Sequence, residues 1–182
     1  MSDIIIRPAT ADDIPIIQSI YAYYVKETVI TFEEEVPNVS EMANRYETIL
    51  GYGMPYLVAE TNERVIGYAY ASLFRGRPAY RYTTEHSIYL DPDKRGMGVG
   101  TKMLNALMKA CEPTGVRQII AVISDAIDGA SVALHKKAGF ELIGTMPATG
   151  YKFDKWVDTT IMQRPICTGS SDKPDGTGLK LT

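Results

Sequence analysis

Hydrophobic positions along the chain recur at two spacings, one typical of strands and one typical of helices. Seven short apolar runs predict strands, at residues 4–7, 56–60, 65–71, 80–90, 118–123, 141–146 and 158–163. Helical spacing and capping signals predict four helices, at residues 16–25, 40–50, 99–111 and 130–138. The resulting order, βααβββαβαββ, indicates an α+β fold of the mixed α/β kind.

The length of the chain and the composition of its end predict how it is organised. The 182 residues suffice for one domain with a full core, and 45% hydrophobic and 23% charged residues are ordinary for a globular protein. From Thr168 onward the chain is dominated by Gly, Ser, Asp, Pro and Lys. We therefore expect a single domain over residues 1–166 and a flexible tail over residues 167–182.

Charge and cysteine usage exclude several classes of partner. The net charge of −3 argues against nucleic acid, and no apolar run approaches the 18 residues that a membrane span needs. The two cysteines, Cys111 and Cys167, have neither metal-ligand spacing nor the pattern of a disulfide framework. The acidic N-terminus lacks a secretory signal. We expect a cytoplasmic protein without a metal.

A glycine-rich run, Arg95 to Gly100 (Arg-Gly-Met-Gly-Val-Gly), separates the strand ending at Leu90 from the helix beginning at Val99. Glycines allow the backbone to approach a ligand closely, and a helix N-terminus offers unpaired N–H groups to an anion. Arg95 adds a cation that can grip phosphate through two hydrogen bonds. The run therefore predicts a site for a nucleotide-containing cofactor with a pyrophosphate.

Other interpretations of the glycine run fit less well. A P-loop needs Gly-Lys-Ser/Thr, whereas Gly100 is followed by Thr101 and Lys102 in the wrong order. A dinucleotide-binding fingerprint needs an acidic residue about 20 positions further on, and Ile120 stands there inside a strand-like run. A plain strand–turn–helix connection with glycines for packing stays open.

A third interpretation fits two blocks of the sequence. The run from Arg95 to Gly100 resembles the Arg/Gln-x-x-Gly-x-Gly/Ala pyrophosphate loop of the GNAT N-acetyltransferases. Asp128 to Phe140 resembles the family's Asn-x-x-Ser-x-x-Leu-[Tyr/His]-x-x-x-Gly-Phe helix and follows about 30 residues later, in the family's order. The resemblance implies the GNAT fold, a central, mostly antiparallel twisted sheet of about seven strands flanked by about four helices. It also implies acetyl-CoA as the co-substrate.

The resemblance implies particular cofactor contacts. The pantetheine arm would run along the edge of the strand at Ile88 and Leu90, with the Leu90 N–H aimed at the thioester oxygen. Asp128 departs from the usual Asn, and a carboxylate cannot donate the hydrogen bond that an amide does. The implied cofactor-binding residues are Ile88, Leu90, Arg95, Gly96, Gly98, Val99, Gly100, Thr101, Ser131 and His135.

Two side chains are candidates for proton transfer. An amine must lose a proton before it attacks, and Glu85, three residues before Ile88, is the candidate base, acting directly or through water. A solvent-facing strand carboxylate is the alternative for Glu85. His135 replaces a tyrosine that protonates the leaving thiolate in many family members, and a histidine can do the same or only contact the cofactor sulfur. His86 alternates to the opposite face from Glu85, so we interpret it as structural.

The resemblance narrows to one subfamily. Tyr82 to Leu90 is similar to the Tyr-x-x-Glu-x-Ser-[Ile/Val]-Tyr-[Leu/Val] of phosphinothricin N-acetyltransferases, and Gly150 to Asp158 is similar to their Gly-Tyr-Lys-x-x-x-Trp-x-Asp. The implied acceptor is the α-amine of a small amino acid or analogue, such as phosphinothricin, methionine sulfoximine or methionine sulfone. The subfamily also implies a homodimer.

Arginines and an aromatic residue are candidates for holding the acceptor. Arg75 and Arg77, in the loop before the Glu85 strand, can clamp a carboxylate through two hydrogen bonds. Among the tyrosines and phenylalanines near the predicted site, we expect Phe32 to line the acceptor pocket. An acetyltransferase for polyamines or peptide N-termini is the alternative, although the arginine pair argues against a polycation. A non-catalytic module that binds acetyl-CoA is a further alternative, which Glu85 and His135 disfavour.

Overall fold

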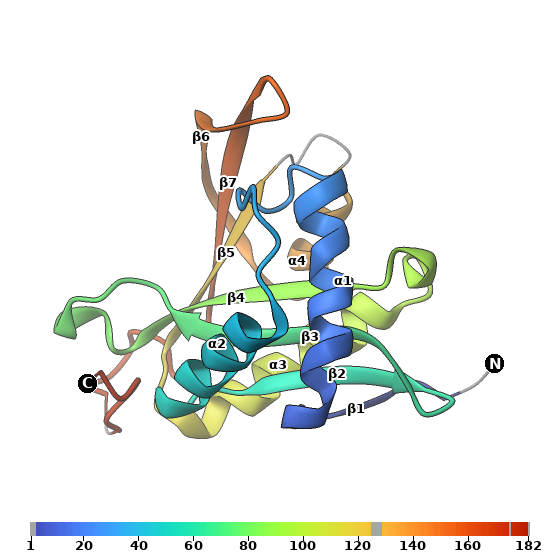
Figure 1. The fold of residues 1–182 in the computed structure, drawn as a ribbon. Helices are drawn as coiled ribbons and strands as arrows, with labels where there is room; N and C mark the ends of the chain where they lie inside the picture. The colour runs from blue at the N-terminus through green and yellow to red at the C-terminus, as the bar shows by residue number, and fades with distance from the viewer. Residues whose placement is uncertain (1–2, 125–128, 175, 182) are drawn as a thin grey trace.

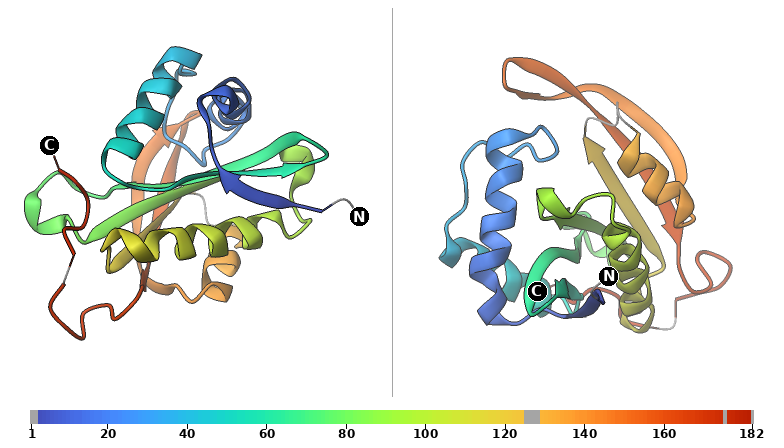
Figure 2. Two further views of the ribbon diagram at one scale, coloured as in Figure 1. Left: turned by 90° about the horizontal axis from the view of Figure 1, so that it is seen from below. Right: turned by 90° about the vertical axis from the view of Figure 1, so that its right-hand side faces the viewer.

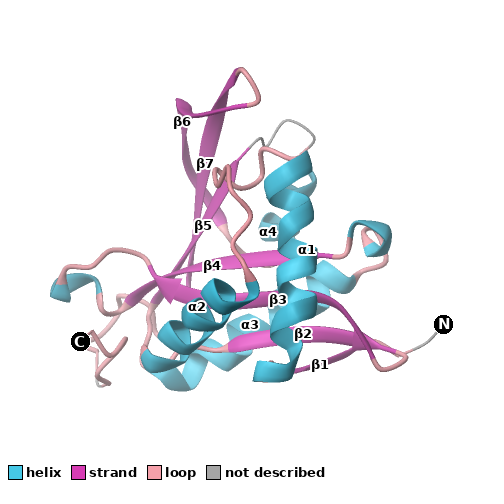
Figure 3. Ribbon diagram, in the orientation of Figure 1, coloured by secondary structure: helices cyan, strands magenta, loops and turns pink. Residues whose placement is uncertain are grey.

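The computed structural model describes residues 3–124, 129–174 and 176–181, and its centre is a twisted sheet of seven strands (Figures 1 and 3). The order of strands across the sheet is β1-β2-β3-β4-β5-β7-β6. All neighbouring pairs are antiparallel except β4 and β5, which are parallel. The strands are β1 (Ile5–Pro8), β2 (Tyr56–Thr61), β3 (Arg64–Leu73), β4 (Thr83–Leu90), β5 (Gln118–Ser124), β6 (Glu141–Lys152) and β7 (Lys155–Pro165).

Helices cover both faces of the sheet, as the two further views show (Figure 2). The helices α1 (Ile14–Glu27) and α2 (Val39–Gly51) lie on one face, and α3 (Val99–Cys111) and α4 (Ala130–Lys137) lie on the other. The helix α3 buries the apolar stripe that its spacing predicts, including Met103, Leu104 and Leu107. The predicted order of strands and helices is confirmed.

Two boundaries differ from the sequence prediction. The strand β4 begins at Thr83 rather than at residue 80, because Pro78–Tyr80 forms a short 3-10 turn that begins with a proline. The hairpin of β6 and β7 is longer than predicted and turns at Phe153 and Asp154, which both have positive φ. The strand β6 continues through Gly150, and its register against β7 shifts between Met146 and Gly150.

The parallel pair at the middle of the sheet is short. Thr83 to His86 of β4 pair with Gln118 to Ala121 of β5, and beyond these residues the two strands diverge (Figure 1). The strand β4 stays paired with β3 up to Leu90, while β5 stays paired with β7 up to Ser124. The carboxyl ends of β4 and β5 therefore face each other across a gap inside the sheet.

The described part of the C-terminal tail, for which the polar composition predicts flexibility, makes contacts with the domain at Leu179 and Lys180. Leu179 is 2% exposed, and its N–H donates to the carbonyl of Arg81 at 2.8 Å. The N–H of Lys180 donates to the carbonyl of Tyr52 at 3.1 Å. One apolar side chain and its backbone hydrogen bonds thus anchor a segment that composition alone describes as disordered.

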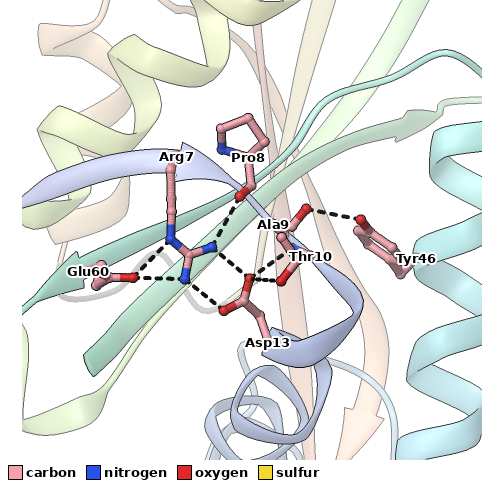
Figure 4. A network of polar contacts seen from close by, with 7 residues as sticks. All are labelled: Arg7, Pro8, Ala9, Thr10, Asp13, Tyr46 and Glu60. Atoms are coloured by element: carbon pink, nitrogen blue, oxygen red, sulfur yellow. Dashed lines mark hydrogen bonds and ion pairs between the residues drawn. The ribbon is translucent and has the colours of Figure 1, made fainter. Parts of the chain in front are cut away.

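The N-terminal strand is tied to α1 by a network of polar contacts around Arg7 (Figure 4). The guanidinium donates to both carboxylate oxygens of Asp13 at 2.7 and 2.8 Å, and to Glu60 of β2 at 2.9 Å. Asp13 also accepts from the N–H of Thr10 at 2.8 Å. The hydrogen bond from Arg7 lowers the pKa of Asp13 below its ordinary 3.8, so the network stabilises the fold.

Replacing Asp13 with Asn should lower the free energy of unfolding at pH 7 by about 1–3 kcal/mol, because a buried charge-assisted pair is lost. Since the folded pKa of Asp13 is lowered, its contribution is present above about pH 3.8 and is lost as the pH falls through the folded pKa. Urea unfolding at pH 7 and pH 3 measures both effects. Asp12→Asn, at an exposed neighbouring position, is the matched control. Equal stability of the two variants at pH 7 would contradict the prediction.

Candidate active site

A cavity of about 860 Å³ fills the gap between the diverging ends of β4 and β5. Its walls come from four elements besides the two strands. They are the C-terminal end of α1, the glycine-rich turn with the start of α3, the start of α4, and the turn of the β6–β7 hairpin. The cavity is therefore formed by segments that are far apart in the sequence.

The glycine-rich run forms one end of the cavity. Gly96 and Gly98 have φ values of 76° and 79°, in the left-handed region that favours glycine, and both line the cavity with Arg95. No atom lies within 4 Å of the position that a Cβ would take on either glycine, so the turn is open on that side. The turn can therefore accept a bulky anion against its backbone.

The helix α3 begins directly after this turn, with Gly98 as its N-cap. Its first N–H groups have no partners within the helix and carry the positive end of the helix dipole. Gly100 and Thr101 line the cavity, whereas the Val99 side chain is buried in the core at 1% exposure. Arg95, the two left-handed glycines and this helix start together form a place that can hold a pyrophosphate.

The edge of β4 forms the floor of the cavity through Ile88 and Leu90. The backbone of Leu90 is engaged by a side chain: Tyr24 of α1 donates its hydroxyl to the Leu90 carbonyl at 2.6 Å and accepts from the Leu90 N–H at 3.2 Å. The Leu90 N–H, which the sequence predicts as a donor to the thioester, therefore already has a partner in this structure.

Glu85 lies on β4 close to the cavity without lining it. The side chain is partly buried, and burial raises the pKa of its carboxyl above the ordinary 4.5. Ser87, two residues further along the same face of the strand, does line the cavity. Glu85 thus combines the position and the raised pKa that a general base near this cavity needs.

The two histidines of the chain meet in the wall of the cavity. The Nε2 atoms of His86 and His135 lie 3.0 Å apart, and both side chains are at most 5% exposed. His135 Nδ1 lies 2.6 Å from the carbonyl oxygen of Ser131, one turn earlier in α4. Our interpretation of His86 as merely structural missed this pair, because strand alternation places a residue on a face but does not reveal what faces it.

The contacts of the pair assign its protons. The Ser131 carbonyl only accepts, so Nδ1 of His135 carries a hydrogen, and a neutral His135 then accepts at Nε2 from His86. His86 Nδ1 is left as a buried acceptor for which the described residues supply no partner. Burial lowers the pKa of both imidazoles, to about 3 for His86, where His135 adds to the effect. Both rings are therefore neutral at physiological pH.

The predicted acceptor-binding residues lie outside the cavity of this single chain. Arg75 and Arg77 are exposed in the loop between β3 and β4, with the Arg75 guanidinium 5.5 Å from the Phe74 ring. Phe32 is 40% exposed, and its ring packs against Gly150 of β6, where a Cβ would collide with it. Ser131 does line the cavity, while Asp128 lies outside the described residues.

Sequence reasoning missed several residues of the cavity wall. Glu27 to Ile30 contribute from the end of α1 and the segment after it, and Phe153 and Lys155 contribute from the β6–β7 hairpin. Tyr24 was one of several tyrosines with a helical spacing that equally fits a core position. Only the subfamily resemblance around Gly150 to Asp158 pointed toward the hairpin, and it assigned no contact there.

Comparison with known proteins identifies the chain. Residues 6–161 match the Acetyltransferase (GNAT) domain. The chain belongs to the GNAT acetyltransferase family. It is 42% identical over 170 residues to phosphinothricin N-acetyltransferase of Alcaligenes faecalis, which covers 93% of this chain and 86% of that protein. It is 36% identical over 159 residues to the L-methionine sulfoximine/L-methionine sulfone acetyltransferase of Pseudomonas aeruginosa, covering 87% and 92%.

A solved structure agrees with these relatives. The crystal structure of a GNAT superfamily phosphinothricin acetyltransferase from Sinorhizobium meliloti, in complex with acetyl-CoA, superposes with a TM-score of 0.91. The two chains are 48% identical, and the match covers 96% of this chain and 94% of the other. The predicted GNAT fold, the acetyltransferase class and acetyl-CoA as co-substrate are confirmed.

The described residues contain neither a group of side chains suited to a metal nor a helix suited to a membrane. No cluster of three or more His, Cys, Asp and Glu side chains in the described ranges is arranged to hold a metal ion. In the same part of the chain, none of the helices of this GNAT domain has the length and apolar character that crossing a membrane requires.

The neutral histidine pair predicts a pH dependence of stability in this acetyltransferase. The unfolded chain binds a proton at His86 below about pH 6.5, while the folded chain resists protonation down to about pH 3, so stability falls as the pH decreases across this window. His86→Gln keeps a neutral donor but removes the titrating group. Wild type should lose up to about 1.4 kcal/mol per pH unit more than the variant. Urea unfolding between pH 7 and pH 4 measures this, and parallel pH profiles would refute it.

Proposed function

We propose that this protein transfers the acetyl group of acetyl-CoA to the α-amine of a small amino acid or analogue, by direct attack in a ternary complex. The proposed acceptors are phosphinothricin, methionine sulfoximine and methionine sulfone, on which the named relatives act. The observation that carries the proposal is the cavity between β4 and β5, which joins the glycine-rich turn at one end to the strand that bears Glu85.

The proposed cofactor position follows from the chemistry of the cavity wall. The pyrophosphate would accept hydrogen bonds from the backbone of Gly96 to Thr101, with Arg95 neutralising part of its charge. The pantetheine arm would lie along Ile88 and Leu90, where β4 has lost its pairing with β5. Ser131 and His135 would border it from α4.

Glu85 would remove the proton from the acceptor ammonium, directly or through water. A carboxylate with an ordinary pKa is a weak base at neutral pH, and burial raises the pKa of Glu85 toward the working range. The free amine would then attack the thioester carbon. Both ring nitrogens of His135 are engaged, so of its two possible roles we favour contact with the cofactor over protonation of the thiolate.

Arg75 and Arg77 would hold the carboxylate of the acceptor, and Phe32 would border its side chain. The two guanidiniums are exposed and lie in the loop that leads into the Glu85 strand. A carboxylate clamp suits an amino acid and disfavours a polyamine, which would bring further positive charges.

The proposal is tested by measuring CoA release with acetyl-CoA and a panel of amines. The panel is phosphinothricin, methionine sulfoximine, methionine sulfone, glutamate, methionine, spermidine and a short peptide. We expect saturable turnover with one or more of the first three and none with spermidine or the peptide. Turnover confined to spermidine or the peptide would replace the amino-acid assignment, and acetyl-CoA binding without any turnover would favour a non-catalytic module.

Glu85→Gln should reduce kcat by about 10²–10⁴-fold while the affinity for acetyl-CoA stays nearly unchanged. In wild type, kcat/KM should fall as the pH drops through the raised pKa of Glu85, and this acidic limb should be absent in the variant. Glu63→Gln, in the exposed turn between β2 and β3, is the control. An unchanged kcat would remove Glu85 from the role of base.

We also propose that the protein forms a homodimer through the β6–β7 hairpin. The strand β6 lies at the edge of the sheet, and large apolar side chains on this hairpin are about half exposed or more. They are Leu142, Ile143, Met146, Tyr151, Phe153 and Trp156. Because Phe153 also lines the cavity, a partner bound here would lie beside the site.

Light scattering of the purified protein should therefore give twice the chain mass of 20.1 kDa. Trp156→Glu should shift the protein toward the monomer, because a charge would be buried in an apolar interface. Val39→Glu, at an exposed apolar position on α2, should leave the mass unchanged. A monomeric wild type at micromolar concentration would contradict the proposed dimer.

A further inference from the structure

The hydroxyl of Tyr24 occupies a particular position at the end of β4. It donates to the carbonyl of Leu90 at 2.6 Å and accepts from the N–H of the same residue at 3.2 Å. The side chain is 4% exposed, and it lines the cavity. Its ring is fixed by edge contacts with Tyr89 at 5.0 Å and Tyr23 at 5.5 Å between ring centroids.

The direction in which the backbone N–H and carbonyl of Leu90 point explains their contact with the Tyr24 hydroxyl. The next residue, Asp91, donates its N–H to Ile66 of β3, so by strand alternation the N–H and carbonyl of Leu90 face the opposite side, where β5 has diverged. Backbone groups in a covered position need partners. One phenolic hydroxyl satisfies both groups of Leu90, in the place that a neighbouring strand would otherwise take.

A phenolic hydroxyl has one proton and two lone pairs, and its proton can rotate about the C–O bond. If the thioester lies beside Leu90, the hydroxyl can keep its hydrogen bond from the Leu90 N–H while its own proton turns from the Leu90 carbonyl toward the thioester oxygen. A hydroxyl that accepts from an amide is polarised and becomes a stronger donor. The Leu90 N–H would thus affect the thioester oxygen indirectly, by making the Tyr24 hydroxyl a stronger donor.

We propose that Tyr24 is a catalytic residue of this enzyme, whose hydroxyl stabilises the negative oxygen that forms during acetyl transfer. The proposal rests on the proposed function, which places the thioester at Leu90. As the amine nitrogen bonds to the acetyl carbon, the carbonyl electron pair moves to oxygen, and Tyr24 donates its hydrogen bond there. Glu85 takes the ammonium proton before the attack. The C–S bond then breaks and its electron pair leaves on sulfur, while the second proton of the attacking nitrogen passes to water and the same water protonates the thiolate.

Arg95 supports this role of Tyr24. Its guanidinium carbon lies 5.2 Å from the centre of the Tyr24 ring and 5.4 Å from that of Tyr23. A cation over an aromatic ring withdraws electron density, which strengthens the phenol as a hydrogen-bond donor. The residue that would hold the pyrophosphate is therefore also in contact with the proposed donor.

The adjacent tyrosine gives a matched control. Tyr23 and Tyr24 lie on the same helix and beneath the same guanidinium, yet only the Tyr24 hydroxyl bonds to Leu90 among the contacts of the described residues. Tyr24→Phe should lower kcat by about 10²-fold, the cost of losing one such donor, with the KM for acetyl-CoA changed less than about threefold. Tyr23→Phe should retain the wild-type kcat.

Donor strength separates catalysis from a structural role. Incorporating 3-fluorotyrosine at position 24 supplies a stronger donor, so kcat should equal or exceed that of wild type. If Tyr24 only satisfies the backbone of Leu90, the loss of kcat across the variants should instead parallel the loss of thermal stability, which is measured on each variant. A kcat for Tyr24→Phe within twofold of wild type, or a loss explained entirely by a higher KM for acetyl-CoA, would overturn the proposal.

Hydrolysis of acetyl-CoA without any amine keeps this test independent of the acceptor. Attack by water forms the same negative oxygen, so hydrolysis by wild type should be slow but measurable, and Tyr24→Phe should reduce it as it reduces amine transfer. If every amine in the panel fails while the variant still loses hydrolysis, the acceptor assignment is wrong and the role of Tyr24 stands. Equal hydrolysis by wild type and Tyr24→Phe would overturn that role.

Discussion

The short parallel pairing of β4 and β5 is the constraint on which the rest of the site depends. The two strands share a register only from Thr83 to His86 and from Gln118 to Ala121. Each strand stays bound to its outer neighbour beyond that point, so the gap is held open by the sheet itself. In the position proposed for it, acetyl-CoA would therefore bind without movement of a strand. The backbone edge of β4 beyond His86 is left unpaired on that side by the topology of the sheet.

Burial acts on the titratable groups of the site in opposite directions. It raises the pKa of Glu85 and lowers the pKa of His86 and His135, because a poorly solvated position disfavours whichever form is charged. The histidine pair of β4 and α4 is therefore uncharged, whereas Arg95 places a cation at the glycine-rich turn. This distribution suits a ligand whose negative charge lies at its pyrophosphate.

The sequence predicts features that depend on residues close together in the chain, but it does not predict contacts between residues that are distant in the chain. Periodicity located the seven strands and four α-helices of the described residues, and the glycine-rich run predicted a turn in which Gly96 and Gly98 have positive φ. The hydrogen bond between Tyr24 and Leu90 joins residues 66 positions apart, and the two histidines are 49 positions apart. No local sequence pattern predicts either contact. The contact of Leu179 likewise depends on a distant residue, since its N–H donates to the carbonyl of Arg81.

The uneven placement of the aromatic residues has a spectroscopic consequence. The chain has one tryptophan and twelve tyrosines. Trp156 is 66% exposed on the β6–β7 hairpin, whereas Tyr56 and Tyr68 lie stacked in the core. Tryptophan fluorescence therefore reports the polarity around the hairpin and is insensitive to the packing of the core. A blue shift of that emission on concentration, or a red shift on dilution, would report this face alone, while tyrosine signals follow the folding of the sheet.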